Sequence, residues 1–284
     1  MQKNYNMILQ HMKSTYTDFI MQTLHEASKI AFHYFGKIGI IQTKENDNNQ
    51  VLTQADIEIG KFIVGRIQKT FPEHNIIDEE AGIIDKKSEF TWVVDPIDGT
   101  SNFAAGDPAY GIMIGLLKEH VPIAGGVIVP SFKELAIAEK GRGAFVNEKQ
   151  VRVTKESKLL SSLVAYAIDG HQENPEITEE ECKILARIVL GIRNLRASGS
   201  VLNGIYVAKG IYGGYLNRTA KIWDAVAENI IIEEAGGVYT DFFGKPVDYS
   251  RPLTRAKQNF TWCAASPTLH KQLQNIIHAK IQET

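Results

Sequence analysis

Two aspartates three residues apart, Asp95 and Asp98, are the residues of this chain best suited to chemistry. They follow an apolar run at residues 92–94 and precede residues 99–102, a turn rich in backbone N–H groups. Paired carboxylates bind hard cations such as Mg²⁺, and clustered N–H groups bind phosphate oxygens. Pro96 has no N–H to donate, so it predicts the end of the strand. The segment predicts a site where a metal ion and a phosphate group meet.

Further acidic residues stand at the ends of other predicted elements. Residues 78–80, Asp-Glu-Glu, follow a short apolar strand, while Asp56 and Asp224 each lie near the start of a predicted helix. An isolated acid at a helix start is usually a cap, because its carboxylate accepts the unpaired N–H groups there. Spacing along the chain does not show that these acids meet, so their joint role depends on the fold.

The first half of the chain predicts helices followed by an antiparallel meander. Apolar side chains at helical spacing predict helices over residues 16–35 and about 53–70, and Thr53 with Asp56 matches a capping arrangement. Short apolar runs at residues 75–77 and 92–94 predict strands. Three β-like runs separated by short turns then predict the meander, at residues 110–117, 121–129 and 134–139.

The second half alternates strands with helices. Strands are predicted at residues 163–168, 194–197, 211–216, 238–240 and 260–264. Helices are predicted at residues 177–190, 200–209 and 220–235, and a last one opens at Ser266-Pro267. The change of pattern near residues 150–160 predicts approximate subdomains at 1–155 and 156–284 within one catalytic unit, residues 1–284.

Composition places the chain among ordinary soluble proteins. Its formal charge of −2 gives no reason to expect nucleic-acid binding, and 44% hydrophobic residues are typical of a globular core. The two cysteines, Cys182 and Cys263, predict buried free thiols, and the histidines show no zinc-ligand spacing. Residues 1–13 lack the apolar core of a signal peptide, and no stretch is long enough to span a membrane. We therefore expect a cytoplasmic protein.

Three motifs in order along the chain resemble the inositol monophosphatase family. They are Asp95-Pro-Ile-Asp-Gly-Thr with Trp92 before it, Ile77-Asp-Glu-Glu upstream, and Trp223-Asp-Ala-Val-Ala-Glu followed by Glu234-Ala-Gly-Gly. That family shares a superfamily with fructose-1,6-bisphosphatase and 3′(2′),5′-bisphosphate nucleotidase. The resemblance implies an α+β fold, a layered α/β/α/β/α sandwich, and Mg²⁺-dependent phosphomonoester hydrolysis that is sensitive to lithium. It also implies a homodimer.

The resemblance implies two to three Mg²⁺ ions per site. Glu79, Asp95 and the carbonyl of Ile97 would bind the first ion, and a third, weaker one is expected near Glu79. Asp95, Asp98 and Asp224 would bind the second ion, with Asp95 bridging the two. A phosphate dianion repels an attacking hydroxide, so cations are needed to neutralise charge and activate water.

The resemblance also implies which residues act on water and phosphate. Thr100 would help Glu79 orient and deprotonate the attacking water, and Asp56 would align Thr100 from behind. Gly99, Thr100 and Ser101 would offer backbone N–H groups to the phosphate. No cysteine or serine nucleophile is required.

Substrate choice is predicted from a different set of residues. Gly199 and Ser200 resemble a segment that touches an inositol ring in the family, but Asn217 stands where many members carry a glutamate. Arg218 and Lys221 follow, and a neutral amide flanked by cations suits a second phosphate or a nucleotide; the alternative is that these cations are solvated. Lys44 matches a loop lysine of the family only loosely.

The prediction is thus a phosphatase of a small phosphorylated metabolite, with inositol monophosphate as the first candidate. The alternative substrates are fructose 1,6-bisphosphate, NADP(H) and 3′-phosphoadenosine 5′-phosphate. A different class of function is a protein- or RNA-associated scaffold. Retained acids at every predicted metal-ligand position favour an active enzyme.

Overall fold

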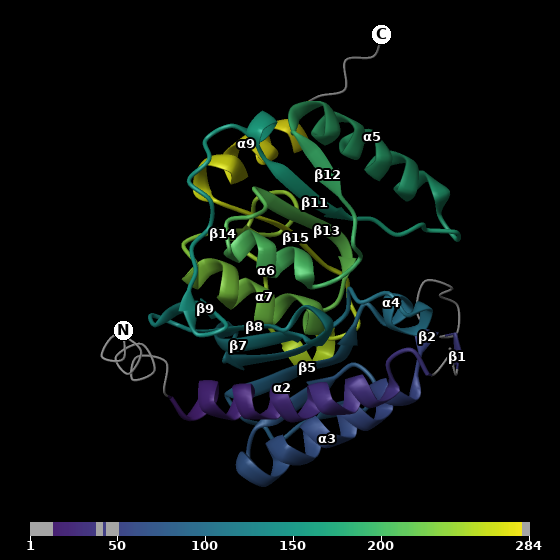
Figure 1. Cartoon of the computed structure of the whole chain (residues 1–284), viewed down its shortest axis with the longest axis vertical. Coiled ribbons are helices and arrows are strands. Elements are labelled where there is room, and N and C mark those ends of the chain that lie inside the picture. Colours follow the sequence, from purple (N-terminus) through teal and green to yellow (C-terminus); the bar gives the residue numbers. More distant parts are fainter. Residues whose placement is uncertain (1–13, 38–41, 44–50, 280–284) are drawn as a thin grey trace.

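Two amphipathic helices form the first layer of the molecule (Figure 1). The computed structural model describes residues 14–37, 42–43 and 51–279, and these helices are α2 (Thr15–Tyr34) and α3 (Gln54–Thr70). Ser14 and Thr53 are their N-caps, each in a capping box. Both helices confirm the sequence prediction, and their apolar faces pack against β7 and β5 of a large sheet.

An eight-stranded sheet forms the second layer and contains the predicted antiparallel meander. Its order is β10-β9-β8-β7-β6-β5-β3-β4, and only β3 and β5 pair in parallel. Its strands are β3 (Asn75–Asp78), β4 (Gly82–Ile84), β5 (Phe90–Asp98), β6 (Gly111–Lys118), β7 (Val121–Val129), β8 (Glu134–Glu139), β9 (Gly143–Val146) and β10 (Lys149–Gln150). Because β3 and β5 are parallel neighbours, the acidic ends of both strands lie at the same edge of the sheet.

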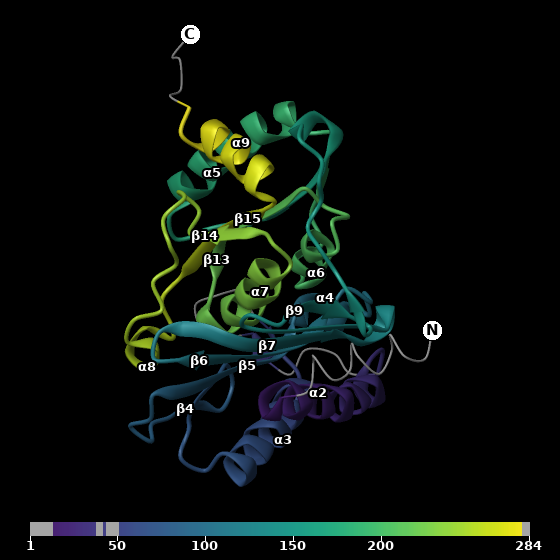
Figure 2. The ribbon, with the colours of Figure 1, turned by 90° about the vertical axis from the view of Figure 1, so that its left-hand side faces the viewer.

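Helices α6 (Leu202–Ala208) and α7 (Ile222–Glu234) form the middle layer between two sheets (Figure 2). Helix α7 is buried on nearly every side, as expected for a helix covered on both faces. Glycines in the large sheet permit its close approach: a Cβ at Gly115 would lie 2.6 Å from Cγ1 of Val226. The packing holds the N-terminus of α7 near the acidic end of β5.

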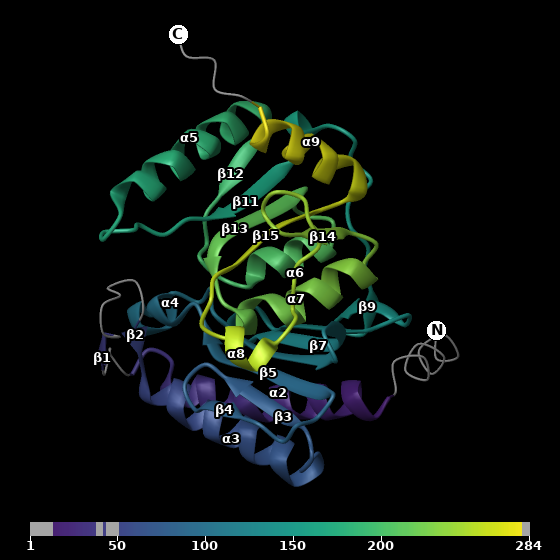
Figure 3. The ribbon, with the colours of Figure 1, turned by 180° about the vertical axis from the view of Figure 1, so that it is seen from behind.

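A five-stranded sheet and two outer helices complete the sandwich, so the predicted α/β/α/β/α layering is confirmed (Figure 3). The sheet order is β12-β11-β13-β15-β14. These elements are β11 (Leu163–Ala167), β12 (Asn194–Arg196), β13 (Gly214–Ala220), β14 (Val238–Thr240), β15 (Phe260–Ala265), α5 (Pro175–Gly191) and α9 (Pro267–Ile277).

The strand predicted at residues 211–216 was wrong by several residues. The chain turns before β13, where the N–H groups of Ile211 and Tyr212 both donate to the Tyr206 carbonyl, and β13 then extends to Ala220. The apolar residues of the turn resembled strand residues, although Ile211 is 46% exposed. The error matters because β13 carries Asn217 and Arg218.

Shorter elements connect the layers: β1 (Gln42–Thr43), β2 (Val51–Leu52), α4 (Thr100–Ala105), η1 (Pro130–Phe132), η2 (Leu159–Ser161) and α8 (Pro252–Arg255). Lys44 and residues 1–13 lie outside the described residues. Cys182 and Cys263 are both free thiols, but only Cys263 is buried, because Cys182 lies on the exposed side of α5. Among the described helices, none combines the length and apolarity needed to cross a bilayer.

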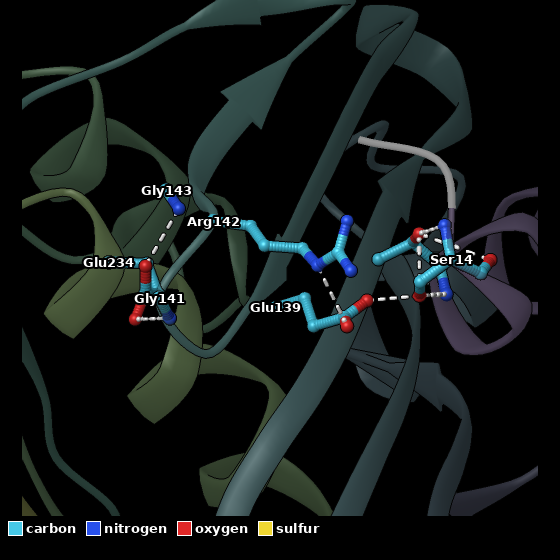
Figure 4. A network of polar contacts seen from close by, with 7 residues as sticks. Ser14, Glu139, Gly141, Arg142, Gly143 and Glu234 are labelled. Carbon is cyan, nitrogen blue, oxygen red and sulfur yellow. Dashed lines mark hydrogen bonds and ion pairs between the residues drawn. The ribbon is translucent and has the colours of Figure 1, made fainter. Parts of the chain in front are cut away.

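The turn between β8 and β9 joins the start of α2 to the end of α7 (Figure 4). Glu139 of β8 accepts a hydrogen bond from the Ser14 hydroxyl at the start of α2, and it pairs with Arg142 Nε at 3.1 Å. On the other side of the turn, the Glu234 carboxylate at the end of α7 accepts the N–H groups of Gly141 and Gly143, at 2.8 and 2.7 Å. This network spans three layers.

Replacing Glu234 by Ala should lower the free energy of unfolding by about 1–3 kcal/mol, because two charge-assisted hydrogen bonds to backbone N–H groups are lost. Urea unfolding followed by circular dichroism measures the effect. The matched control is Glu180→Ala, at an exposed position of α5. Equal unfolding midpoints for the two variants would show that the Glu234 contacts contribute nothing.

Candidate active site

The predicted acidic residues meet in one pocket of about 280 Å³ between the two sheets. Its walls come from β5, α4, β13 and α7, which are distant in sequence. The predicted site residues that line it are Glu79, Asp95, Ile97, Asp98, Gly99, Thr100, Ser101, Gly199, Ser200, Asn217 and Asp224. Two predicted residues, Asp56 and Arg218, do not line it.

Three carboxylates form the centre of this pocket. One oxygen each from Asp95, Asp98 and Asp224 lies within 4.8 Å of the others, a grouping that suits a metal ion. Asp224 is the third residue of α7, where its Oδ2 accepts the Lys221 N–H at 2.6 Å. Asp98 Oδ2 accepts the N–H of Val201. Asp224 therefore both caps its helix and faces the other acids.

Strand β5 delivers its two aspartates differently from the sequence prediction. Pro96 does not end the strand, which continues to Asp98 and resumes pairing where Asp98 lies opposite Gly111. The register shifts between Asp95 and Asp98, and this irregularity accommodates the missing N–H of Pro96. The shift directs both carboxylates into the pocket.

The electrostatics of the three acids favour a bound cation. Burial, with the neighbouring charges of Glu79, Asp224 and Asp98, raises the pKa of Asp95 well above its ordinary value. Burial and the Asp224 carboxylate raise the pKa of Asp98 to about 7. Asp95 Oδ1 is buried and has no hydrogen-bond partner among the described residues. Carboxylates that repel each other, one of them with a buried oxygen that has no donor, fit a divalent cation.

These shifts predict how pH affects stabilisation by a cation. Below about pH 4 the folded and unfolded forms are both protonated at these acids, but in the folded form Asp98 holds its proton up to about pH 7. Their contribution to the stability of cation-free protein is therefore lost as pH rises through the folded pKa values. Saturating Mn²⁺ should raise the melting temperature by several degrees more at pH 8 than at pH 5. Equal gains at both pH values would contradict these pKa shifts.

Asp56 and Thr100 form a hydrogen-bonded pair behind the acids. The Thr100 hydroxyl lies 2.8 Å from the Ile97 carbonyl and 3.3 Å from Asp56 Oδ1, so its single proton is shared between these acceptors. Asp56 Oδ2 accepts the Thr53 N–H at 2.8 Å. Burial raises the pKa of Asp56 to about 6, against the lowering effect of the hydrogen bonds from Thr53. Asp56 thus caps α3 and also contacts Thr100 from the side away from the pocket.

Helix α4 places its first backbone N–H groups beside the acids. Gly99 is its N-cap with φ of +77°, and a Cβ there would lie 3.1 Å from the Ala109 carbonyl, so only glycine fits without strain. The Asn102 side chain donates to the carbonyls of Ala109 and Ser198 at 2.7 and 2.8 Å. Asn102 therefore ties α4 to the Gly199 loop, a role that the sequence did not indicate.

The far wall of the pocket is formed by alternate residues of β13. Tyr215, Asn217 and Thr219 line the pocket, and the Thr219 hydroxyl donates to Asp169 Oδ2 at 2.6 Å. Arg218 lies on the opposite face, its guanidinium over the rings of Phe242 and Phe243 at 5.1 and 5.6 Å. The prediction that Arg218 touches substrate is therefore corrected: neighbouring residues of a strand point to opposite faces.

Lys221 lines the pocket, but its Nζ donates to Asn259 Oδ1 at 2.6 Å and to the Lys257 carbonyl at 3.2 Å. Asp169 and Glu228 also line the pocket and were not predicted. Glu228 stands one helical turn after Asp224 and so lies on the same side of α7; this spacing could have identified it from sequence.

Comparisons with known proteins show which family and which solved structures the chain resembles. The family model described as "Inositol monophosphatase family" matches residues 12–283. A protein of Aquifex aeolicus named fructose-1,6-bisphosphatase/inositol-1-monophosphatase is 32% identical, covering 76% of this chain and 81% of that protein. The Nus factor SuhB of Vibrio cholerae is 34% identical, covering 72% and 76%. A crystal structure of extragenic suppressor protein suhB from Bartonella henselae matches with a TM-score of 0.84 at 26% identity, covering 94% and 100%.

Proposed function

Because the chain belongs to the inositol monophosphatase family, whose members hydrolyse phosphomonoesters, we propose that it removes phosphate from a small hydroxylated metabolite with the help of Mg²⁺. Inositol monophosphate is the proposed substrate. The observation that carries this proposal is the convergence of Asp95, Asp98 and Asp224 beside the first N–H groups of α4.

The acids of the pocket have the donor chemistry that Mg²⁺ requires. Glu79, Asp95 and the Ile97 carbonyl would hold one ion, and Asp95, Asp98 and Asp224 another. When bound, Mg²⁺ neutralises phosphate charge, acidifies water and stabilises the leaving alkoxide. These ligand assignments follow the family resemblance, and the pocket supports them by bringing the residues together.

The remaining residues orient the reactants. Glu79, together with the Thr100 hydroxyl, would orient the attacking water, and Glu79 would accept its proton. Asp56 holds the Thr100 hydroxyl in place from behind. The backbone N–H groups of Gly99, Thr100 and Ser101 would hold the phosphate oxygens, since the first N–H groups of a helix lack partners within it. The work is mainly positioning and electrostatic stabilisation.

The leaving-group side of the pocket favours an uncharged polyol over a second phosphate. Its described wall contains the Asn217 amide and the Asp169 carboxylate, which accept hydrogen bonds from hydroxyl groups and, for Asp169, repel an anion. Arg218 faces away, and two N–H donors of Lys221 are already used within the protein. Gly199 and Ser200 complete this side of the pocket and would contact the same leaving group.

The proposal is tested by Mg²⁺-dependent phosphate release from four compounds: myo-inositol 1-phosphate, fructose 1,6-bisphosphate, NADP⁺ and 3′-phosphoadenosine 5′-phosphate. We expect the highest kcat/KM for myo-inositol 1-phosphate and no release with chelator. A higher kcat/KM for any of the other three would reject inositol monophosphate as the substrate. No phosphate release from any of the four would reject the phosphatase function.

A second candidate function is a scaffold role, suggested by the relative named Nus factor SuhB. The pocket retains its acids, so the two roles are compatible. Association with a protein or RNA partner, together with no phosphate release from the four compounds, would favour the scaffold role alone.

A further inference from the structure

We propose that Glu228 is an additional carboxylate of the cation centre, which strengthens divalent-cation binding at Asp98 and Asp224. The inference rests on the proposed function, because it concerns the same pocket. It assigns a role to a residue that closes the motif at residues 223–228 but is not among the predicted metal ligands.

Glu228 is placed by α7, one turn after Asp224, and it lines the same pocket. Side chains of a helix lean toward its N-terminus, so the Glu228 carboxylate lies over the turn that carries Asp224. Gly204 of α6 provides the space: a Cβ there would lie 2.3 Å from Glu228 Oε1. The close packing of α6 on α7 thus directs this carboxylate toward the pocket.

The surroundings of Glu228 lack a partner for its charge. The residue is only 3% exposed, and neither carboxylate oxygen has a hydrogen-bond partner of good geometry among the described residues. The charges that act on it are those of Asp98 and Asp224, both negative, with the Gly204 N–H as the single favourable neighbour. A buried carboxylate left in this state is costly.

A cation bound by Asp98 and Asp224 would turn the repulsion that acts on the Glu228 carboxylate into an attraction. Glu228 is not among the three residues whose oxygens lie within 4.8 Å of one another, but it lines the same pocket. A divalent ion held by Asp98 and Asp224 would attract the Glu228 charge, which those two carboxylates otherwise repel, in buried surroundings where Coulomb interactions are strong. The added negative charge would in turn tighten cation binding.

The test is calorimetric titration of the full chain with Mn²⁺ alone, without substrate. Glu228→Gln keeps the side-chain shape but removes the charge, and we expect at least about tenfold weaker Mn²⁺ binding. The control is Glu181→Gln, because Glu181 is also a buried glutamate on a helix but lies on α5, outside the pocket, beside Tyr166 and Arg218. It should leave Mn²⁺ affinity unchanged. Gly204→Ala, which displaces the Glu228 carboxylate, should weaken binding in the same direction.

Mn²⁺ affinity within twofold of the wild type in Glu228→Gln would overturn the proposal, because a permanently protonated Glu228 resembles glutamine. Melting curves without cation identify any variant that fails to fold. If Glu228→Gln does not fold, the Mn²⁺ affinity of Gly204→Ala decides whether the proposal holds. Asp98→Asn separates this result from the proposed function. If Asp98→Asn weakens Mn²⁺ binding and Glu228→Gln does not, only the role of Glu228 fails; if neither does, the cation centre itself is wrong.

Discussion

Asp95→Asn should lower kcat for phosphate release by at least about 10²-fold, with much weaker dependence on Mg²⁺. The Asp95 carboxylate belongs to the group of three acids and would contribute to both proposed cation sites. Asparagine has the same shape, so the change removes charge without leaving a cavity. Steady-state phosphate release over a range of Mg²⁺ concentrations measures the effect.

Loss of folding is excluded by measuring the melting temperature of the same variant without cation. Asp95 is buried among repelling carboxylates, so Asn should leave that temperature equal or higher. Asp85→Asn is the matched control, since Asp85 is an exposed acid that pairs with Lys87. Turnover of Asp95→Asn within tenfold of the wild type would reject the proposed two-ion arrangement.

Thr100→Val should lower kcat by about 10²-fold while KM changes little, because positioned proton transfer contributes factors of this size. Valine keeps the branched shape of threonine but removes the hydroxyl that lies between the Ile97 carbonyl and Asp56. Thr100→Ser restores a hydroxyl at the same position. Initial rates at saturating and limiting substrate separate the two parameters.

Serine should recover most of the lost turnover if the hydroxyl orients water. Equal losses in Thr100→Val and Thr100→Ser would instead indicate that the methyl group matters through packing at the start of α4. A rise in KM without a change in kcat would assign Thr100 to substrate binding alone.

Local patterns in the sequence predicted most of the fold. The helices at residues 16–35 and 53–70 follow from apolar spacing and capping residues, which act over a few residues. The meander followed from runs of apolar residues broken by short turns. Two predictions were wrong for the same reason: that Pro96 ends its strand, and that a strand covers residues 211–216. Pairing with neighbouring strands decides where a strand continues.

The sequence predicted that Asp95 and Asp98 suit a metal ion, because this prediction depends only on a few consecutive residues. The family resemblance then indicated that Glu79 and Asp224 join them. The position of Arg218 could not be read in the same way. With β13 shifted, Asn217 and Arg218 lay beyond the predicted strand, so their alternation between its faces was lost. Glu228 was identifiable from its spacing after Asp224, but its burial without a hydrogen-bond partner depends on the packing of α6 on α7.

From the sequence alone came the acidic residues suited to a metal ion and a phosphate group, and the family resemblance implied the layered fold and a metal-assisted phosphatase. The fold places Asn217 in the pocket wall and Arg218 against Phe242, and it brings Glu228 into the pocket with Asp98 and Asp224. The difference lies in how far along the chain the deciding contacts are. Motifs and caps depend on neighbours along the chain, whereas the direction of a side chain depends on the strand register and on which layer covers each face.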